Sequence, residues 1–476
     1  MLFTEPTFLF LFLPILLGLY FVRGSREHAA YGNWLLLAAS IIFYAKGGGA
    51  FTWLMLGSIA FNYWMAIAVD RAHGTPAGSR RLAFAVTINL IVLGVFKYAN
   101  FFADNVNAIL QAAHAAPIAV PRVLLPIGIS FFTFHAISYV IDVSRRDATA
   151  QKSPVHAALY LLLFPQLIAG PIIRYREIAA QLSRRLVTSD GFAAGAFRFT
   201  IGLAKKVLIA NNVALAADAI FGMPVEQLTA AHAWIGAVCY TLQIYFDFSG
   251  YTDMAIGLGA MFGFRFPENF NYPYIAASVQ EFWRRWHMSL SRWFRDYLYV
   301  PLGGNRISTG RTYVNLVTVF FLCGLWHGAN WTFVIWGLYH GTFLVLERLV
   351  PTLTRKRASI PARVLGHAYL LLTVVVGWVF FRADSFTHAV GFLRAMAGAG
   401  IGAPTSLAPE WYLDPQTTMA IALGIVGSTP RVAEWARTLD GRPVAIGRPA
   451  VVALLLVVCT MFIAARSYNP FIYFRF

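Results

Sequence analysis

The sequence predicts an all-α fold of transmembrane helices, on the evidence of composition, apolar run length and the placement of basic residues. Hydrophobic residues make up 58% of the 476-residue chain and charged residues 12%, whereas soluble domains are usually about 25% charged. A bilayer core about 30 Å thick needs about 20 mostly apolar residues per helical crossing, and several runs qualify. We expect a single polytopic domain over residues 1–476, with about 11 or 12 spans plus re-entrant and interfacial helices.

The loops of the first third alternate in their content of basic residues. Residues 8–22 are interpreted as a retained helix, because they lack the basic start and small-residue cleavage site of a secretory signal. The turn at 47–50 and the segment 99–121 contain no Lys or Arg and are expected outside the cytoplasm. The bases expected on the cytoplasmic side are Arg23, Arg26, Arg71, Arg80, Arg81, Arg145, Arg146 and Lys152.

The net charge is +17, from 38 Lys and Arg against 21 Asp and Glu. In a soluble protein this excess would suggest nucleic acid as a partner, but the positive-inside rule accounts for it here, and we expect no nucleic-acid partner. Cys239, Cys323 and Cys459 lie in apolar runs without CxxC or Cys/His ligand spacing, so neither a disulfide scaffold nor a zinc site is indicated. No metal or nucleotide motif emerges from the sequence.

Residues 159–173 depart from the pattern of a simple crossing. Pro165, Gly170 and Pro171 interrupt this apolar run, and bases flank it on both sides. Irregular backbone at membrane depth is tolerated only where it is buried in protein or lines a wet cavity. The segment therefore predicts a re-entrant pair or a broken helix beside a cavity.

Residues 280–299 have an amphipathic pattern. Apolar side chains recur at helical spacing, whereas most arginines fall on other faces, which is typical of an interfacial helix, here on the cytoplasmic side. The apolar positions are Trp283, Trp286, Leu290, Trp293 and Tyr297, and the basic ones are Arg284, Arg292 and Arg295. Further spans are expected over 313–326, 331–346, 368–381, 419–426 and 451–464.

The strongest candidate for chemistry is His327, near the junction of two apolar runs. Ionisable groups inside a membrane are expensive and are functional hypotheses by default. An imidazole can accept a proton from a hydroxyl nucleophile, although a buried histidine can equally bond to a neighbouring helix, and the residues alone leave both readings open. Trp326 precedes it, and Asn330 and Trp331 would share its face if the helix continued. His287 is the second candidate, with lipid-headgroup contact as the plainer alternative.

Other polar residues lie within apolar runs. Gln243, Asp247 and Asp253 could line a hydrophilic passage, or pair with Lys205 and Lys206 across helices, which is the commoner role for each taken singly. The aromatic tail over 467–476 follows the last span. Arginines precede that span in greater number than they follow it, so the tail is expected outside. Its Tyr473 belongs either to an interfacial aromatic belt or to a docking or acyl-accepting site.

Several strings together resemble the membrane-bound O-acyltransferase family, in particular the bacterial branch typified by the membrane subunit of alginate O-acetyltransferase. They are LPIGISFFTFHAISYVIDV, LLLFPQLIAGPIIRY, QIYFDFSGYTDMAIG, PENFNYPY, EFWRRWHMSLSRWFRDYLYVPLGGNR and GLWHGANWTFVIWGLYHG. The resemblance implies helices around a membrane tunnel, His327 as the active-site histidine and His287 as a second functional histidine on the cytoplasmic side.

The resemblance also implies a reaction and its participants. An acyl group passes across the bacterial inner membrane, where membrane lipids surround the protein, to an extracytoplasmic partner. The group is expected to be acetyl from acetyl-CoA, with an acyl carrier protein as the other possible donor. That partner is commonly a serine-dependent, SGNH-like acetyltransferase that modifies a polysaccharide, and this chain has no GDSx motif of its own. The tail resembles an aromatic motif of related relays, which makes Tyr473 a candidate acyl carrier. A phenol, with a pKa near 10, is a better leaving group than an alkanol.

Three alternatives stay open at the level of sequence. The same fold also carries D-alanyl transfer to teichoic acid from a carrier protein, although the motifs lie closer to the alginate branch. A transporter without covalent chemistry would also have broken helices and intramembrane polar residues. Acylation of a lipid would need a lipid acceptor, which nothing in the sequence demands. The polysaccharide itself is not named by the sequence.

Overall fold

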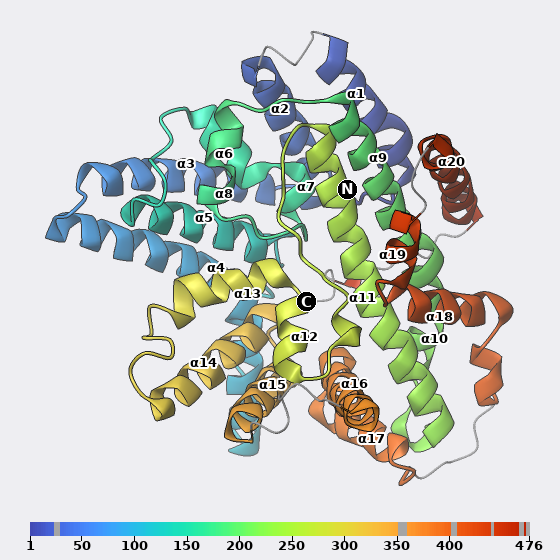
Figure 1. Cartoon of the computed structure of the whole chain (residues 1–476). Helices are drawn as coiled ribbons and strands as arrows, with labels where there is room; N and C mark the ends of the chain where they lie inside the picture. The colour runs from blue at the N-terminus through green and yellow to red at the C-terminus, as the bar shows by residue number, and fades with distance from the viewer. Residues whose placement is uncertain (23–28, 351–358, 401–406, 439–441, 466–470, 473–476) are drawn as a thin grey trace. The chain divides into compact units, whose positions relative to one another are not determined.

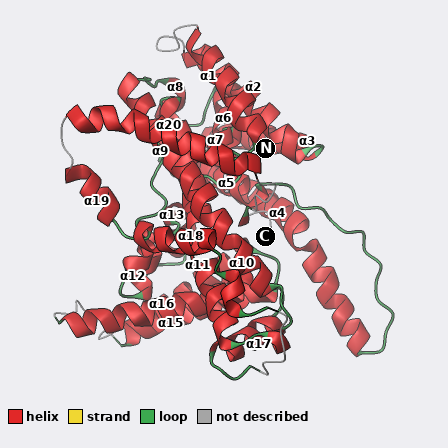
Figure 2. Cartoon of the chain, turned by 90° about the vertical axis from the view of Figure 1, so that its right-hand side faces the viewer, coloured by secondary structure: helices red, strands yellow, loops and turns green. Residues whose placement is uncertain are grey.

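Every regular element in the described part of the chain is a helix (Figures 1 and 2). The computed structural model describes all residues except 23–28, 351–358, 401–406, 439–441, 466–470 and 473–476. The prediction of an all-α fold is confirmed. The chain divides into two compact units, Met1–Phe199 with Met254–Pro267, and Thr200–Asp253 with Glu268–Phe476.

The helices that lie wholly in the first unit come from the first 200 residues. They are η1 (Phe8–Phe12), α1 (Leu13–Val22), α2 (Ala29–Gly48), α3 (Phe51–Arg71), α4 (Pro76–Ala112), α5 (Ile129–Ser144), α6 (Pro154–Leu162), α7 (Phe164–Leu167) and α8 (Tyr175–Ser183). Two helices contribute to both units, α9 (Ser189–Ala204) and α11 (Ala230–Met261).

The second unit contains the remaining helices. They are η2 (Lys205–Ala210), α10 (Asn211–Phe221), η3 (Val225–Gln227), η4 (Pro273–Ile275), α12 (Val279–Arg285), α13 (Met288–Phe294), η5 (Arg295–Tyr299), α14 (Thr309–His327), α15 (Trp331–Leu349), α16 (Ile360–Arg382), α17 (Phe386–Met396), η7 (Pro409–Tyr412), α18 (Pro415–Gly427), α19 (Arg431–Thr438) and α20 (Arg442–Ala465).

Helices α3 and α4 are joined by a pair of buried amides. The Asn62 and Asn89 side chains donate to each other's oxygens at 3.1 and 2.8 Å. Side-chain amides in a membrane find no water to bond, so reciprocal pairing between helices satisfies groups that would otherwise be costly to bury. Thr75 begins α4 by accepting from the backbone N–H of Gly78, with Pro76 at the first helical position, where its missing N–H costs nothing.

The segment 159–173 is broken, as its prolines predict. Helix α6 ends at Leu162, the short α7 follows, and the backbone from 168 to 174 is irregular but buried. Its polar groups are satisfied within the protein. The Ile173 N–H donates to Nε2 of His135 at 3.1 Å, and the Tyr160 hydroxyl donates to the Ile173 carbonyl at 2.9 Å. His135 therefore has a structural role in this segment.

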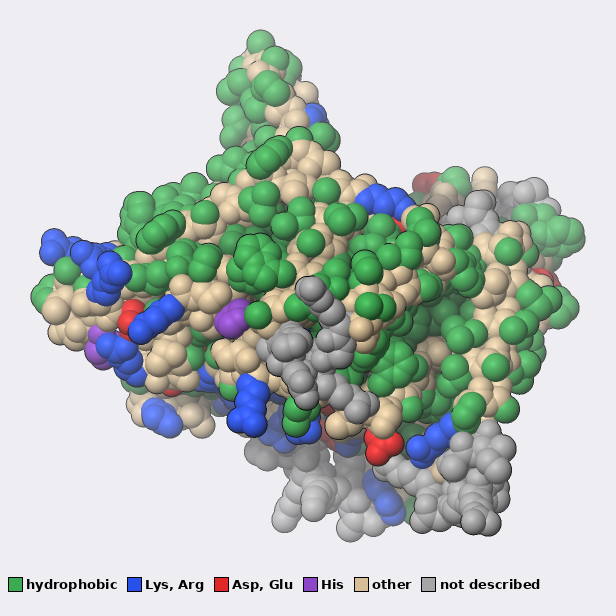
Figure 3. Space-filling model, turned by 90° about the horizontal axis from the view of Figure 1, so that it is seen from above, with side chains coloured by type: hydrophobic (Ala, Val, Ile, Leu, Met, Phe, Trp, Pro, Cys, Tyr) green, Lys and Arg blue, Asp and Glu red, His purple; other side chains and the backbone are tan. Residues whose placement is uncertain are grey.

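Large apolar side chains face outwards, and broad hydrophobic areas are visible on the surface in Figure 3. Trp53 and Trp64, for example, are 78% and 65% exposed, which suits contact with lipid rather than water. Among the described residues, five helices are long and apolar enough to cross a membrane, and 8–22 and 129–144 form shorter apolar helices. The number of about 11 or 12 crossings stays a prediction.

The segment predicted as one helix over 280–299 is instead three consecutive pieces, α12, α13 and η5. The break lies at His287, whose backbone is left-handed with φ 44° and ψ 52°. The expected amphipathicity is present, since Trp286, Leu290 and Trp293 are buried and Arg284 is exposed. Apolar spacing reports which face is buried, but it does not report a single residue whose backbone leaves the helical region.

Candidate active site

His327 is positioned by the close crossing of α14 and α15, which pack as a hairpin (Figure 1). A Cβ on Gly324 would lie 2.3 Å from the Phe333 carbonyl oxygen, and one on Gly337 would lie 2.3 Å from that of Phe320. Only glycine allows the two backbones to approach so closely. His327 is the last residue of α14, one turn beyond Gly324.

The helix does not continue past His327, so the shared face considered for Asn330 and Trp331 is not formed. Gly328 is extended, and Asn330 is the N-cap of α15, where its Oδ1 accepts the Thr332 N–H at 3.0 Å. Its amide nitrogen donates to the Asp384 carbonyl at 3.2 Å. Asn330 thus supports the turn after His327 and is not among the residues that line the cavity described below.

Aromatic rings enclose the His327 imidazole. The residue is 5% exposed, and its ring centroid lies 4.9 Å from Trp326, 5.1 Å from Trp336 and 5.1 Å from Phe381. Such a wall fixes the orientation of the imidazole and excludes water, which strengthens its electrostatic interactions.

His287 lies in the same environment. It is 1% exposed, its ring centroid is 6.1 Å from Trp326, and Phe248 of α11 packs against it edge-on at 4.7 Å. Burial lowers the pKa of His287 to about 3, so the ring is uncharged at physiological pH. The plainer interpretation, in which this residue reaches lipid headgroups, does not suit a buried side chain.

Asn269 holds the break at His287. Its side-chain oxygen is 3.0 Å from Nδ1 of His287 and accepts the Ser289 backbone N–H at 3.1 Å and the Ser289 hydroxyl at 2.9 Å. Its backbone carbonyl accepts the Met288 N–H at 2.9 Å. These bonds satisfy the first turn of α13 and compensate for the left-handed backbone of a non-glycine residue.

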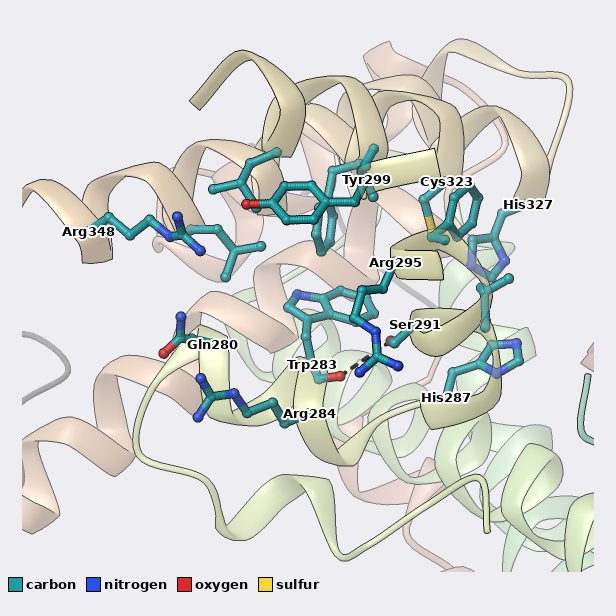
Figure 4. A pocket seen from close by; sticks show the side chains of 16 residues that line it. Gln280, Trp283, Arg284, His287, Ser291, Arg295, Tyr299, Cys323, His327 and Arg348 are labelled. Carbon is teal, nitrogen blue, oxygen red and sulfur yellow. Dashed lines mark hydrogen bonds between the residues drawn. The ribbon is translucent and has the colours of Figure 1, made fainter. Parts of the chain in front are cut away.

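Both histidines line one cavity of about 230 Å³, which we call the histidine cavity. In Figure 4 the two imidazoles lie at one end of the cavity, whereas Arg284, Arg348 and Gln280 lie at the other. The guanidinium groups of Arg284 and Arg348 form no ion pair with any residue that the structure describes. The remaining lining residues are Trp283, Leu290, Ser291, Phe294, Arg295, Tyr299, Leu316, Val319, Phe320, Cys323 and Leu344.

Glu347, near the end of α15, holds the start of α12. The carboxylate is 2% exposed and accepts the backbone N–H groups of Val279 at 2.6 Å and Gln280 at 2.8 Å. A negative charge is favoured at a helix N-terminus, and the Ser278 hydroxyl caps the same turn. Helix α15, which begins just after His327, therefore also fixes α12, the short helix that precedes His287.

The other polar candidates do not line the histidine cavity. Asp247 pairs with Lys206 at 2.8 Å, both side chains being buried, and Asp253 pairs with Lys205 at 2.6 Å. Gln243 is also buried on α11. Asp247 and Asp253 therefore form ion pairs with lysines of a neighbouring helix, which is the second of the two roles that the sequence allowed.

The C-terminal tail is described only at Phe471 and Ile472 of its aromatic part, and Tyr473 lies outside the described residues. The Ile472 N–H donates to Asp247 Oδ2 at 2.8 Å, and the Phe471 ring lies 4.8 Å from that of Tyr251. Asp247 and Tyr251 are one turn apart on α11, on either side of Phe248, which contacts His287.

Sequence reasoning did not single out Asn269 or Glu347, and it named Arg284 only as a basic position of the amphipathic segment, without Arg348. Asn269 stood within a string quoted for the resemblance, and Glu347 was visible as a carboxylate at the end of an apolar run. Their roles depend on backbone groups supplied by distant segments, which spacing along the chain does not reveal. In the described part of the chain, no group of three or more His, Cys, Asp or Glu residues could hold a metal ion.

Comparison with known proteins identifies the family. Residues 53–387 match the membrane-bound O-acyltransferase family. The chain belongs to this family. It is therefore an O-acyltransferase and a multi-pass membrane protein, as predicted. The second half of the match contains both histidines, so the cavity lies within the region that the family shares.

Two of the relatives cover the whole chain. It is 43% identical to a probable alginate O-acetylase of Azotobacter vinelandii over 100% of both proteins, and 34% identical to a peptidoglycan O-acetyltransferase of Helicobacter pylori over 100% of this chain and 98% of that protein. A teichoic acid D-alanyltransferase of Bacillus subtilis is 29% identical over 58% of this chain and 73% of its own length.

Proposed function

We propose that this enzyme transfers acetyl groups from a cytoplasmic thioester across the bacterial inner membrane for the O-acetylation of an extracytoplasmic polysaccharide. The observation that carries the proposal is one cavity with two imidazoles at one end and, at the other end, two guanidinium groups that form no ion pair with any described residue. Relatives named for alginate and peptidoglycan acetylation match this chain along its whole length, whereas the D-alanyltransferase matches 58% of it. That difference favours acetyl over D-alanyl transfer.

In the proposed reaction His327 is the general base. The neutral imidazole accepts the proton of an acceptor hydroxyl, whose oxygen attacks the thioester carbonyl. The carbon–sulfur bond then breaks, and the thiolate takes the proton back from the imidazolium. General acid–base catalysis of this kind contributes about 10²- to 10⁴-fold. His287, which lines the same cavity, is the second functional histidine.

The arginine end of the cavity suits a phosphorylated donor. Arg284 and Arg348 present multiple N–H donors in a geometry that matches phosphate oxygens. Acetyl-CoA carries phosphates far from its thioester, and so does the phosphopantetheine of an acyl carrier protein. We assign the donor to acetyl-CoA and place the arginine end towards the cytoplasm, in agreement with the basic loops around α12.

We further propose that Tyr473, in a tail on the extracytoplasmic side, carries the acetyl group to a serine-dependent, SGNH-like partner. The bond between Ile472 and Asp247 supports this role, because it seats the preceding residue on α11, close to the part of that helix that packs against His287. An aryl ester keeps much of the transfer potential of a thioester, since phenol is a good leaving group.

The test supplies labelled acetyl-CoA to the purified enzyme in proteoliposomes, with and without the partner. The proposal expects label on Tyr473 and, when the partner is present, on the partner and then the polymer. The variant Tyr473→Phe should leave the enzyme unlabelled and block transfer to the partner, and His327→Ala should block label incorporation altogether. Folded enzyme that places label on neither Tyr473 nor the partner would exclude the relay.

The exposed His73 offers a matched control, because His73→Ala removes an imidazole of the chain that lies outside the cavity. This variant should keep the wild-type rate. A transporter without acyl chemistry would show no dependence on acetyl-CoA in any variant. The remaining donor is tested by supplying D-alanyl-loaded carrier protein in place of acetyl-CoA. Faster labelling from this donor would show that the enzyme transfers D-alanyl groups and not acetyl groups.

A further inference from the structure

The hydrogen bonds around Asn269 define which atom of its side chain faces His287. A backbone N–H can only donate, and the Ser289 N–H points at one terminal atom of the Asn269 amide at 3.1 Å. That atom must therefore be the carbonyl oxygen, and the alternative orientation of the amide is excluded. The opposite atom, the amide nitrogen, lies 3.4 Å from the Thr252 hydroxyl oxygen, which can accept its hydrogen.

The same oxygen is 3.0 Å from Nδ1 of His287. Because a carbonyl oxygen cannot donate, the hydrogen of this bond must be on Nδ1. In a neutral imidazole the other nitrogen, Nε2, then carries the lone pair. Nε2 of His287 is buried and has no hydrogen-bond partner among the described residues, and the residue lines the histidine cavity.

We propose that Asn269 is a positioning residue that fixes His287 in the Nδ1–H tautomer, so that Nε2 presents a proton acceptor to the histidine cavity. This inference rests on the proposed function for its catalytic meaning, because a substrate hydroxyl or thiol in the cavity is what Nε2 would accept from. The tautomer itself is a property of the resting protein. Asn269 is fully buried and meets no substrate, so it acts through His287.

An amide suits this task better than a carboxylate would. Asn269 accepts three hydrogen bonds at one neutral oxygen, and therefore it orients the ring without stabilising an imidazolium. An anionic partner at the same distance would favour the charged ring and raise its pKa. Other charged or titratable groups that line the same cavity are Arg284, Arg295, Tyr299, Cys323, His327 and Arg348.

The first experiment measures the tautomer directly. Wild-type enzyme labelled with ¹⁵N-histidine is examined by NMR in lipid nanodiscs without donor, and the His287 signals are assigned by their loss in His287→Gln. We expect the proton on Nδ1. A proton on Nε2 would overturn the proposal, whether or not the enzyme transfers acetyl groups, so that failure of this inference is distinguished from failure of the proposed function.

The second experiment compares Asn269→Asp with Asn271→Asp. Asn271 is exposed two residues further on, and so its variant introduces the same charge without a contact to His287. The pH dependence of His287 modification by diethyl pyrocarbonate, which reacts with the neutral ring, is followed by mass spectrometry. Asn269→Asp should move the midpoint up by about 1 to 3 pH units, and Asn271→Asp should leave it unchanged. Equal midpoints in the two variants would overturn the proposal.

A third variant separates positioning from folding. Asn269→Ala removes the acceptor without adding charge, and it should lower kcat for acetyl transfer while KM for acetyl-CoA stays within twofold. If Asn269 served only to hold the backbone, loss of folded protein would be the sole effect. Full activity of Asn269→Ala at wild-type protein level would contradict the positioning role.

Discussion

At the scale of the residue, the two histidines owe their properties to different surroundings. Aromatic rings enclose His327 on three sides, so its orientation is set by packing. His287 is oriented by one polar neighbour, Asn269, across a break in its own helix. Packing tolerates small changes in neighbouring rings, whereas a single hydrogen bond does not survive removal of its acceptor. We therefore expect the orientation of His287 to be more sensitive to a single substitution than that of His327.

The cavity arginines give a prediction about substrate binding. Under the proposed function, Arg284→Ala and Arg348→Ala each remove a hydrogen-bond donor to the phosphates of acetyl-CoA, and a hydrogen bond to a charged group is worth about 1.5–3 kcal/mol. We expect KM for acetyl-CoA to rise roughly 10- to 100-fold while kcat changes little, because these contacts are made equally in the ground and transition states. Steady-state rates in proteoliposomes measure the effect.

The matched control for these variants is Arg306→Ala. Arg306 is exposed and follows the same segment, but it does not line the cavity, so KM should be unchanged. A fall in kcat at constant KM in Arg284→Ala and Arg348→Ala would contradict donor binding at this end.

The residues of the site differ in how far the sequence predicts them. His287 and His327 stand within recognisable strings, and a histidine in an apolar run is conspicuous. Asn269 bonds to the His287 ring and to Ser289, 18 and 20 positions away in the chain, and Glu347 bonds to backbone 67 to 68 positions away. No local pattern carries such information, because any buried amide or carboxylate would look the same in one dimension.

At the scale of the element, the crossing of α14 and α15 places His327. Gly324→Ala would put a methyl carbon 2.3 Å from the Phe333 carbonyl oxygen, which forces the helices apart one turn before the histidine. We expect activity to fall at least tenfold and the enzyme to unfold at a lower temperature, because overpacking typically costs about 1–3 kcal/mol. Acetyl transfer and thermal unfolding of the same preparation measure both effects.

Gly310, in the first turn of the same helix, is the control for that substitution. A Cβ there has no heavy atom within 4 Å, and alanine favours a helix over glycine by about 1 kcal/mol. Gly310→Ala should therefore keep full activity and equal or higher stability. If both alanine variants behave alike, the close approach of the helices does not determine the position of His327.

The start of α12 gives a second prediction at this scale. Glu347→Ala leaves one buried and one partly buried backbone N–H group without their acceptor, and an unsatisfied buried donor costs about 1–3 kcal/mol. Glu347→Gln keeps one oxygen as an acceptor and should lose about half as much stability. Denaturation in detergent measures the stability of each variant. Glu410 is exposed, so Glu410→Ala is the control that should not change stability. An unchanged stability in Glu347→Ala would show that the carboxylate does not support this helix.

The helices also show where hydrophobic periodicity reaches its limit. For residues 280–299 it identified the buried face correctly, at Trp286, Leu290 and Trp293. It missed the break at His287, because the left-handed backbone there depends on Asn269, 18 positions earlier. The broken segment 159–173 was predictable because its prolines act locally. Breaks caused by local residues could be predicted from the sequence, whereas a backbone conformation stabilised by a distant residue could not.

At the scale of the whole molecule, a relay across a membrane requires donor and acceptor to meet the cavity from opposite sides. From the positive-inside rule we expect the basic loops that surround α12, and with them the arginine end, on the cytoplasmic side, and we expect the tail outside. A tail in the cytoplasm could not hand an acyl group to an extracytoplasmic partner. The side on which the tail emerges is thus the property on which the relay depends.

Cysteine labelling in intact cells decides that side. All three native cysteines, Cys239, Cys323 and Cys459, are buried, so a membrane-impermeant maleimide should give little background in the wild type. We expect Arg475→Cys to be labelled in intact spheroplasts. Arg81→Cys, near the start of α4 at an end expected inside, should be labelled only after the membrane is permeabilised. Label on Arg81→Cys alone in intact spheroplasts would invert the topology, and with it the assignment of the arginine end to the cytoplasm, since α12 and the start of α4 are expected on the same side.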